Sequence, residues 1–107
     1  MTKGQVKTVQ TIARQYGLPK PIAEYKFHPT RRWRVDYFFE HKGKRVALEV
    51  EGGIWGYGRH NRATGFIKDM EKYNALAVQG IFLLRVQPQD LFKVSIYEQL
   101  QQIFKYE

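Results

Sequence analysis

The spacing of apolar residues along the chain predicts three helices and four strands. Apolar residues recur at helical intervals in some segments, and runs rich in β-branched and aromatic residues fill others. The expected helices cover residues 4–16, 66–79 and 94–106, and the expected strands cover 24–28, 33–39, 45–51 and 81–86. Gly17 and Pro19 end the first helix, and Gly80 ends the second. The order is therefore α-β-β-β-α-β-α.

Three segments in this pattern carry more specific expectations. The strand over 81–86 (IFLLRV) is apolar almost throughout, as in strands that are buried on both faces. Residues 52–65 hold five glycines and are expected to form a loop. The apolar residues of the second helix share one side of it, which predicts an amphipathic helix; they are Phe66, Met70, Tyr73 and Ala77.

The two central strands form a hairpin whose register gathers carboxylates. A polar turn over 41–44 sets Glu40 opposite Arg45 and therefore pairs Asp36 with Glu49. The same register pairs Arg34 with Glu51 and Phe38 with Ala47, all on one face. The opposite face is expected to be core; it carries Val35, Tyr37, Phe39, Val46, Leu48 and Val50. Asp36, Glu49 and Glu51 should then have Cβ atoms roughly 5 Å apart.

Three carboxylates at that spacing favour a metal site. Their mutual repulsion raises their pKa values or requires a counter-cation. A ligand set made only of oxygen suits Mg²⁺ or Mn²⁺, and an ion held there can polarise a phosphodiester and activate a water. The alternative is that Arg34 and Arg45 neutralise the acids as surface ion pairs. We favour the metal site, because the triad ends an apolar strand and a glycine-rich loop follows at once.

Composition adds a hint about the partner. The chain has 107 residues, enough for one domain, and its 43% hydrophobic content indicates a folded core. Eighteen Lys and Arg face ten Asp and Glu, giving a net charge of +8, which suits a polyanion but also fits a merely soluble basic surface. The absence of cysteine excludes disulfides and thiolate chemistry. No run approaches a membrane span or a signal peptide, so we expect a cytoplasmic protein with no membrane partner.

With its order of elements, Asp36 and the segment Glu49-Val50-Glu51, the chain resembles the PD-(D/E)XK nuclease superfamily. It is similar to the small stand-alone nucleases of phages and prophages, and to the Vsr-like and restriction-type branches. Further matching residues lie beyond the hairpin: Arg59, His60, Gly65, Phe66, Asp69, Lys72 and Asn74. The resemblance implies a restriction-endonuclease-like α/β fold over 1–107, with an αβββαβ core, a mixed sheet flanked by helices, and an added C-terminal helix. It also implies an Mg²⁺- or Mn²⁺-dependent nuclease acting on DNA, with RNA not excluded.

The sequence departs from the family at one position, where the usual lysine is Glu51. The nearest replacement is Lys72, with Lys68 one turn before it; the alternative is a surface lysine paired with Asp69. If Lys72 is catalytic, we expect its removal to slow cleavage and hardly change stability. Glu24 is similar to the N-terminal acid that several branches add to the metal site, and it is equally well explained as a solvated charge near a strand end.

Basic and aromatic residues are candidates for nucleic-acid contacts. We expect these contacts from Arg31, Arg32, Arg34, Trp55, Arg59, His60 and Arg62. His60 could bind the scissile phosphate or shuttle a proton, or could be a surface loop residue. Trp33 shares the parity of Val35 and is expected in the core, and His28 and His41 are interpreted as structural.

The sequence leaves several functions open. The favoured one is a DNA endonuclease that selects structures or nicks one strand. Alternatives are a site-specific homing or mismatch-type endonuclease and a non-catalytic nucleic-acid-binding module, although a pure binder gains nothing from acids near phosphates. A purely structural protein would leave the Gly-Arg-His loop unexplained. One carboxylate cluster breaks one strand, so a duplex cut needs two, most simply from a C2 homodimer.

Overall fold

The expected order of elements is confirmed by a computed structural model, which describes residues 1–52 and 62–105. The helices are α1 (Lys3–Gln15), α2 (Arg62–Val78) and α3 (Val94–Lys105), with a short 3-10 turn, η2 (Pro88–Asp90), before α3. The strands are β1 (Ile22–Lys26), β2 (Arg34–His41), β3 (Lys44–Val50) and β4 (Ile81–Val86). Most bounds lie within one or two residues of the prediction, but α2 begins four residues early, so residues 62–65 are helical rather than loop.

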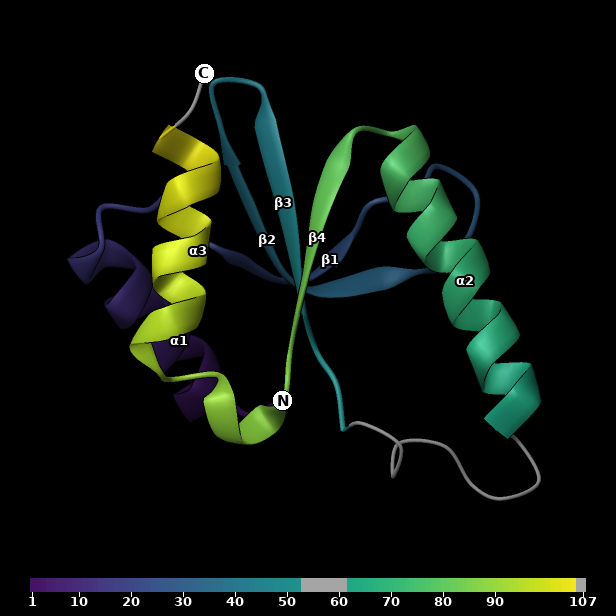
Figure 1. The fold of residues 1–107 in the computed structure, drawn as a ribbon, viewed down its shortest axis with the longest axis horizontal. Coiled ribbons are helices and arrows are strands. Elements are labelled where there is room, and N and C mark those ends of the chain that lie inside the picture. The colour runs from purple at the N-terminus through teal and green to yellow at the C-terminus, as the bar shows by residue number, and fades with distance from the viewer. Residues whose placement is uncertain (53–61, 106–107) are drawn as a thin grey trace.

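The strands form one mixed sheet in the order β1-β2-β3-β4. The β1–β2 and β2–β3 pairs are antiparallel, whereas β3 and β4 are parallel because α2 crosses between them. Helices α1 and α3 lie on one side of the sheet and α2 lies on the other (Figure 1). This is the α/β architecture that the sequence predicted.

Two hydrophobic clusters hold these layers together. The α1/α3 cluster includes Tyr37, Phe39 and Leu48 from the sheet, and Leu100 from α3, all almost fully buried. The α2 cluster joins Phe38 and Ala47 to the helix residue Leu76. One expectation was wrong: Val35 packs in the α2 cluster rather than with Tyr37 and Phe39. The alternation of β2 is therefore interrupted between Val35 and Tyr37, at Asp36.

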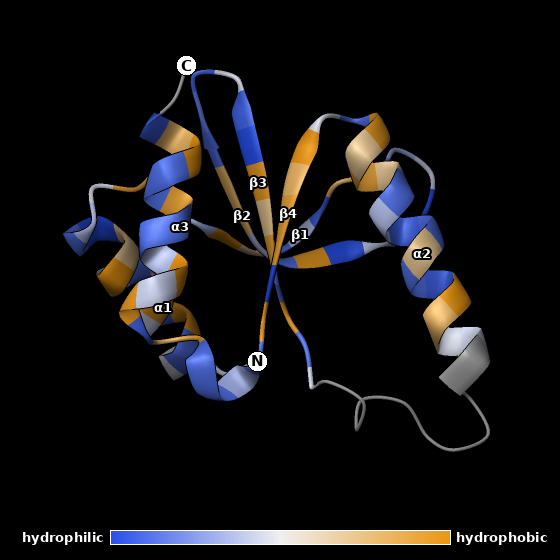
Figure 2. Cartoon of the chain, viewed as in Figure 1, coloured by the Kyte–Doolittle hydropathy of each residue, from blue (hydrophilic) through white to orange (hydrophobic). Residues whose placement is uncertain are grey.

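The α2 helix buries only part of the side that its apolar pattern suggests, since Tyr73 packs against the α2 cluster but other members of that side do not. Leu76 is fully buried, whereas Phe66 and Met70 are 60% and 45% exposed. Figure 2 shows hydrophobic residues of α2 beyond the part of the helix that faces the sheet. The side of α2 in contact with the sheet therefore includes Lys72, one turn before Leu76.

The strand β4 is not buried on both faces, as its sequence suggested. It lies at the edge of the sheet, with Phe82 54% exposed. A continuous apolar run is typical of a central parallel strand, but α3 and α2 cover only part of this edge. Edge position also leaves Arg85 accessible, which matters for the site described below.

The hairpin turn is tighter than expected. The predicted register is confirmed for Phe38–Ala47 and Glu40–Arg45, whereas the predicted Arg34–Glu51 pair lies beyond the end of the ladder and is not formed among the described residues. β2 continues to His41 and β3 starts at Lys44, so that only Lys42 and Gly43 form the turn. Both have positive φ, +50° and +83°, as in the primed turns that match strand twist. The centre of the hairpin is unchanged, and Glu40 therefore lies opposite Arg45 as predicted.

This turn yields a stability prediction. Lys42 adopts a left-handed conformation that asparagine tolerates better than lysine. Lys42→Asn should therefore raise the free energy of unfolding by about 0.5 kcal/mol, measured by urea denaturation. Lys26→Asn, at an exposed strand position with ordinary φ, is the matched control and should be neutral or destabilising. Equal effects of the two substitutions would contradict the turn geometry.

Candidate active site

Asp36 and Glu49 meet where the β2–β3 ladder ends. Regular pairing runs from His41–Lys44 to Tyr37–Leu48 and stops there. Beyond it, each carboxylate accepts a hydrogen bond from the backbone of the other strand. The N–H of Asp36 donates to Oε1 of Glu49 at 2.9 Å, and the N–H of Val50 donates to Oδ2 of Asp36 at 2.7 Å. The two acids therefore lie together as predicted, but they are joined by hydrogen bonds from backbone N–H groups to carboxylates and not by backbone pairing.

Lys72 reaches this pair from α2. Its Nζ lies 2.9 Å from Oε2 of Glu49, and the two side chains are only 16% and 10% exposed. The reach from α2 to Glu49 that the sequence suggested is thus observed, and the alternative pairing of Lys72 with Asp69 is not. Lys68, one turn earlier, is exposed.

Burial dominates the electrostatics of Glu49. It raises the pKa of this carboxyl above its ordinary value, and the nearby charge of Asp36 adds to the effect. The hydrogen bond and the positive charge of Lys72 act in the opposite direction, as does the N–H of Asp36. Lys72 therefore stabilises an ionised carboxylate in a place that water hardly reaches.

Glu51 is directed elsewhere than the sequence predicted. The chain leaves β3 after Val50, and the Glu51 N–H bonds the carbonyl of Val86 on the neighbouring strand. The carboxylate of Glu51 then accepts from Arg85, with Nε–Oε1 at 2.9 Å and Nη2–Oε2 at 2.6 Å, and from the hydroxyl of Tyr73. Burial alone would raise the pKa of Glu51, but Arg85 and Tyr73 outweigh it and hold the pKa below its ordinary value. Over residues 1–52 and 62–105, no three acidic or histidine side chains are grouped to hold an ion.

Asp69 belongs to the same group of charged side chains, since it interacts with Glu51, Lys72 and Arg85. Its pKa is raised by partial burial and by the charge of Glu51, whereas the positive charges of Lys72 and Arg85 act to lower it. The cluster thus contains four carboxylates and two cations, which leaves a net charge of −2 when all are ionised; its members are Asp36, Glu49, Glu51, Asp69, Lys72 and Arg85. This negative centre lies in a chain whose total charge is +8.

Glu24 lies on the neighbouring strand β1, opposite Asp36, but it does not contact the Asp36–Glu49 pair. The β1–β2 ladder pairs Ala23 with Tyr37 and Tyr25 with Val35, and skips the position between them. Glu24 is exposed there, with φ of +50°, a strained conformation for a non-glycine residue. Both ladders of β2 are therefore interrupted at Asp36.

The predicted basic residues just before β2 and at its first position lie on the surface. Arg31, Arg32 and Arg34 are exposed, and the guanidinium of Arg31 lies 4.0 Å from the ring centre of Trp33 and 3.4 Å from Glu71. Trp33 packs against the α2 cluster, which confirms its expected core role.

Among the histidines, His28 is structural, since its Nδ1 accepts from the N–H groups of Thr30 and Arg31. The expectations for Trp55, Arg59 and His60 lie outside the described residues. Arg62 is the first residue of α2.

Sequence reasoning missed Arg85 and the roles of Tyr73 and Asp69. Arg85 is the one charged residue in the apolar run over 81–86, and that contrast was the available signal. It is the register partner of Glu49 in the parallel β3–β4 ladder. This neighbour relation depends on the crossover through α2 and is not visible in local spacing.

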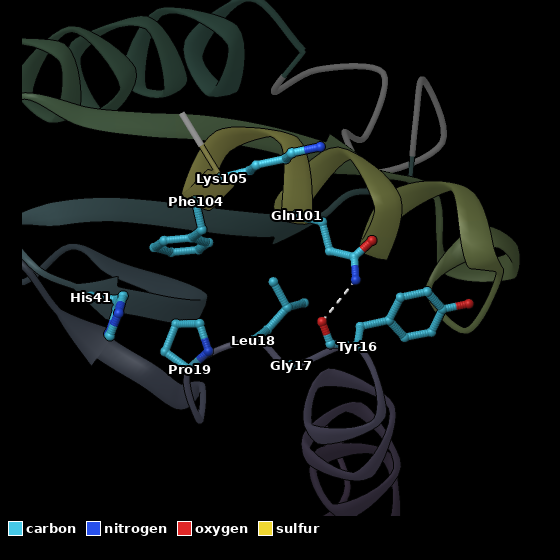
Figure 3. Close-up of a pocket in the computed structure, with 8 residues that line it drawn as sticks. All are labelled: Tyr16, Gly17, Leu18, Pro19, His41, Gln101, Phe104 and Lys105. Carbon is cyan, nitrogen blue, oxygen red and sulfur yellow. Dashed lines mark hydrogen bonds between the residues drawn. The ribbon is translucent and has the colours of Figure 1, made fainter. Parts of the chain in front are cut away.

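A pocket lies on the other side of the sheet from this cluster. It has a volume of about 690 Å³ and is formed by the end of α1, the link after it, His41 and α3 (Figure 3). Its polar side chains include His41, Gln101 and Lys105, and the side chain of Gln101 already donates to the carbonyl of Tyr16. It contains none of the carboxylates, and we therefore place the candidate site at Asp36, Glu49 and Lys72.

No family model, curated protein or solved structure matches this chain. In the part of the chain that the structure describes, no helix is long and apolar enough to cross a membrane.

The burial of the Lys72–Glu49 pair corrects the expectation that Lys72 contributes little to stability. Lys72→Ala would leave a buried carboxylate without its cation, and should lower the free energy of unfolding by about 1–3 kcal/mol at neutral pH. Lys68→Ala, in the same helix but exposed, should change it by less than about 0.5 kcal/mol. Urea denaturation of both variants tests this, and equal stabilities would show that the ion pair is not formed in solution.

Proposed function

We propose that this protein is a metal-dependent endonuclease that hydrolyses phosphodiester bonds in DNA in the cytoplasm, with Asp36, Glu49 and Lys72 at its active centre. The observation that carries the proposal is the local arrangement of charge. Two carboxylates from neighbouring strands meet at the end of a ladder, and a nearly buried lysine contacts one of them. The resemblance to PD-(D/E)XK nucleases supports the same assignment.

The donor set fits Mg²⁺ or Mn²⁺. Asp36 and Glu49 supply only carboxylate oxygens, the ligands that these ions prefer. The hydrogen bond to Asp36 uses Oδ2, and Oδ1 has no partner among the described residues. The net charge of −2 around the site would be compensated by one divalent ion. When bound, such an ion would polarise the phosphodiester and lower the pKa of a water molecule.

Lys72 has the features of a charge-stabilising group. Its ammonium is fixed by Glu49 and shielded from water, so that it interacts strongly with negative charge that develops on a phosphate. Only one of its three N–H donors is needed for the contact with Glu49. Lys72 would then replace the lysine that is missing at position 51.

The rest of the surface suits a polyanion. Sixteen basic and six acidic residues remain outside the cluster, since two of the eighteen cations and four of the ten acids belong to it. This positive field would attract DNA and would make binding depend steeply on salt. The negative centre would lie within a positive surround, which favours phosphate approach once a cation is bound.

The direct test removes one charge and keeps the shape. Asp36→Asn retains an oxygen that accepts from the N–H of Val50, but it cannot supply a carboxylate to a metal. Mg²⁺-dependent cleavage of plasmid and branched DNA should be abolished, with DNA binding changed little. Glu40→Gln, an exposed acid on the same strand, is the control and should cleave normally. Cleavage by Asp36→Asn at the wild-type rate would remove Asp36 from the site.

A second test concerns the lysine. Lys72→Ala should slow single-turnover cleavage by roughly 100-fold, the scale on which a preorganised charge donor contributes. Lys68→Ala should cleave within about twofold of wild type, because an exposed lysine is screened by water. Rates are compared at temperatures where both variants are folded. A rate for Lys72→Ala within a few-fold of wild type would assign Lys72 a structural role only.

A further inference from the structure

Arg85 is held in one orientation beside the candidate active centre. Its Nε and Nη2 donate to the two oxygens of Glu51, at 2.9 and 2.6 Å. Its guanidinium carbon lies 5.0 Å from the ring centre of Tyr73, whose hydroxyl donates to the same carboxylate. A bidentate ion pair and an aromatic ring thus fix a side chain that would otherwise be flexible.

The fixed guanidinium retains an edge for a ligand. A guanidinium offers one pair of donors from Nε and one terminal nitrogen, and a second pair from the two terminal nitrogens. Glu51 occupies the first pair, and Nη1 has no partner among the described residues. The side chain is 55% exposed, so the second edge is accessible. Planar pairs of N–H donors match the oxygens of a phosphate.

The position of Arg85 relates this edge to the proposed reaction. Arg85 pairs with Glu49 in the β3–β4 ladder, about one strand spacing of 4.8 Å away. Glu51 and Tyr73 hold it on the side of the sheet that α2 covers, where Lys72 contacts Glu49. A DNA strand whose scissile phosphate lies at Asp36 and Glu49 would therefore bring a neighbouring phosphate to Arg85.

We propose that Arg85 binds a backbone phosphate next to the scissile one, and that Glu51 and Tyr73 are positioning residues that hold its guanidinium for this contact. The inference rests on the proposed nuclease function for the identity of the ligand. It gives Glu51 a role at the third motif position that differs from metal binding. The contact joins an exposed guanidinium to a half-buried carboxylate, and its bidentate geometry fixes the plane of the guanidinium as well as pairing the charges.

The test measures DNA binding in the cleavage-deficient Asp36→Asn protein, with a fluorescein-labelled duplex and anisotropy over a range of salt. Arg85→Ala should weaken binding at least tenfold and lower the salt slope by about one. Arg85→Lys keeps the charge but not the paired donors, and should restore the slope without the full affinity. Arg14→Ala, the same change on exposed α1 across the sheet, is the control and should weaken binding less than threefold.

Glu51→Gln separates positioning from net charge. If charge alone mattered, removing an acid near phosphates would tighten binding. If Glu51 positions Arg85, Glu51→Gln should instead weaken binding several-fold, and should have no further effect in the Arg85→Ala protein. Circular dichroism confirms folding of each variant, and Arg85→Gln replaces Arg85→Ala if the latter does not fold.

The outcomes distinguish this inference from the proposed function. Equal effects of Arg85→Ala and Arg14→Ala, or tighter binding by Glu51→Gln, would overturn the role of Arg85 even if the wild-type protein cleaves DNA. Loss of binding in Arg85→Ala together with absence of Mg²⁺-dependent cleavage by wild type would support the phosphate contact and remove the nuclease. Absence of DNA binding by both the wild-type and Asp36→Asn proteins would overturn both.

Discussion

The exchange of hydrogen bonds between Asp36 and Glu49 is the constraint on which the candidate site depends. Where the β2–β3 ladder stops, the N–H groups of Asp36 and Val50 need new acceptors, because an unsatisfied buried N–H is costly. Each is satisfied by the carboxylate from the opposite strand. Two acids that would repel each other in water are thereby held together by the backbone. A feature of sheet structure thus creates a concentration of negative charge.

The same constraint explains why α2 carries a lysine on its packed side. Glu49 is held by the backbone and cannot turn toward water, so a cation must come to it. Lys72 lies one turn from Leu76, which is fully buried in the α2 cluster. Packing at Leu76 therefore fixes the height of Lys72 over the sheet. In this way the hydrophobic cluster sets the position of the one ammonium that contacts Glu49 among the described residues.

The sequence was sufficient for what depends on local spacing. Periodicity identified the helices and strands, and the centre of the hairpin turn set the register that brings Asp36 to Glu49. It failed where tertiary context decides. An apolar run does not distinguish an edge strand from a central one, so β4 was wrongly expected to be buried on both faces. The interruption of β2 at Asp36 places Val35 on the face of the sheet that α2 covers, which alternation alone did not predict. Arg85 was missed because its contact with Glu51 requires the parallel β3–β4 register, which no local pattern contains.

The pairing of charges also indicates where a cation would be most strongly attracted. Glu49 and Glu51 each have their own partner, Lys72 and Arg85 respectively. The negative charge that these two pairs do not balance belongs to Asp36 and Asp69, and only Asp36 is joined to a second carboxylate through the backbone. Asp36 and Glu49 are therefore the residues that would hold a divalent ion in the proposed reaction, with Lys72 fixed beside them by Glu49. Since the contact with Glu49 needs only one of the three N–H donors of Lys72, a preorganised ammonium with free donors would face a phosphate bound at these carboxylates.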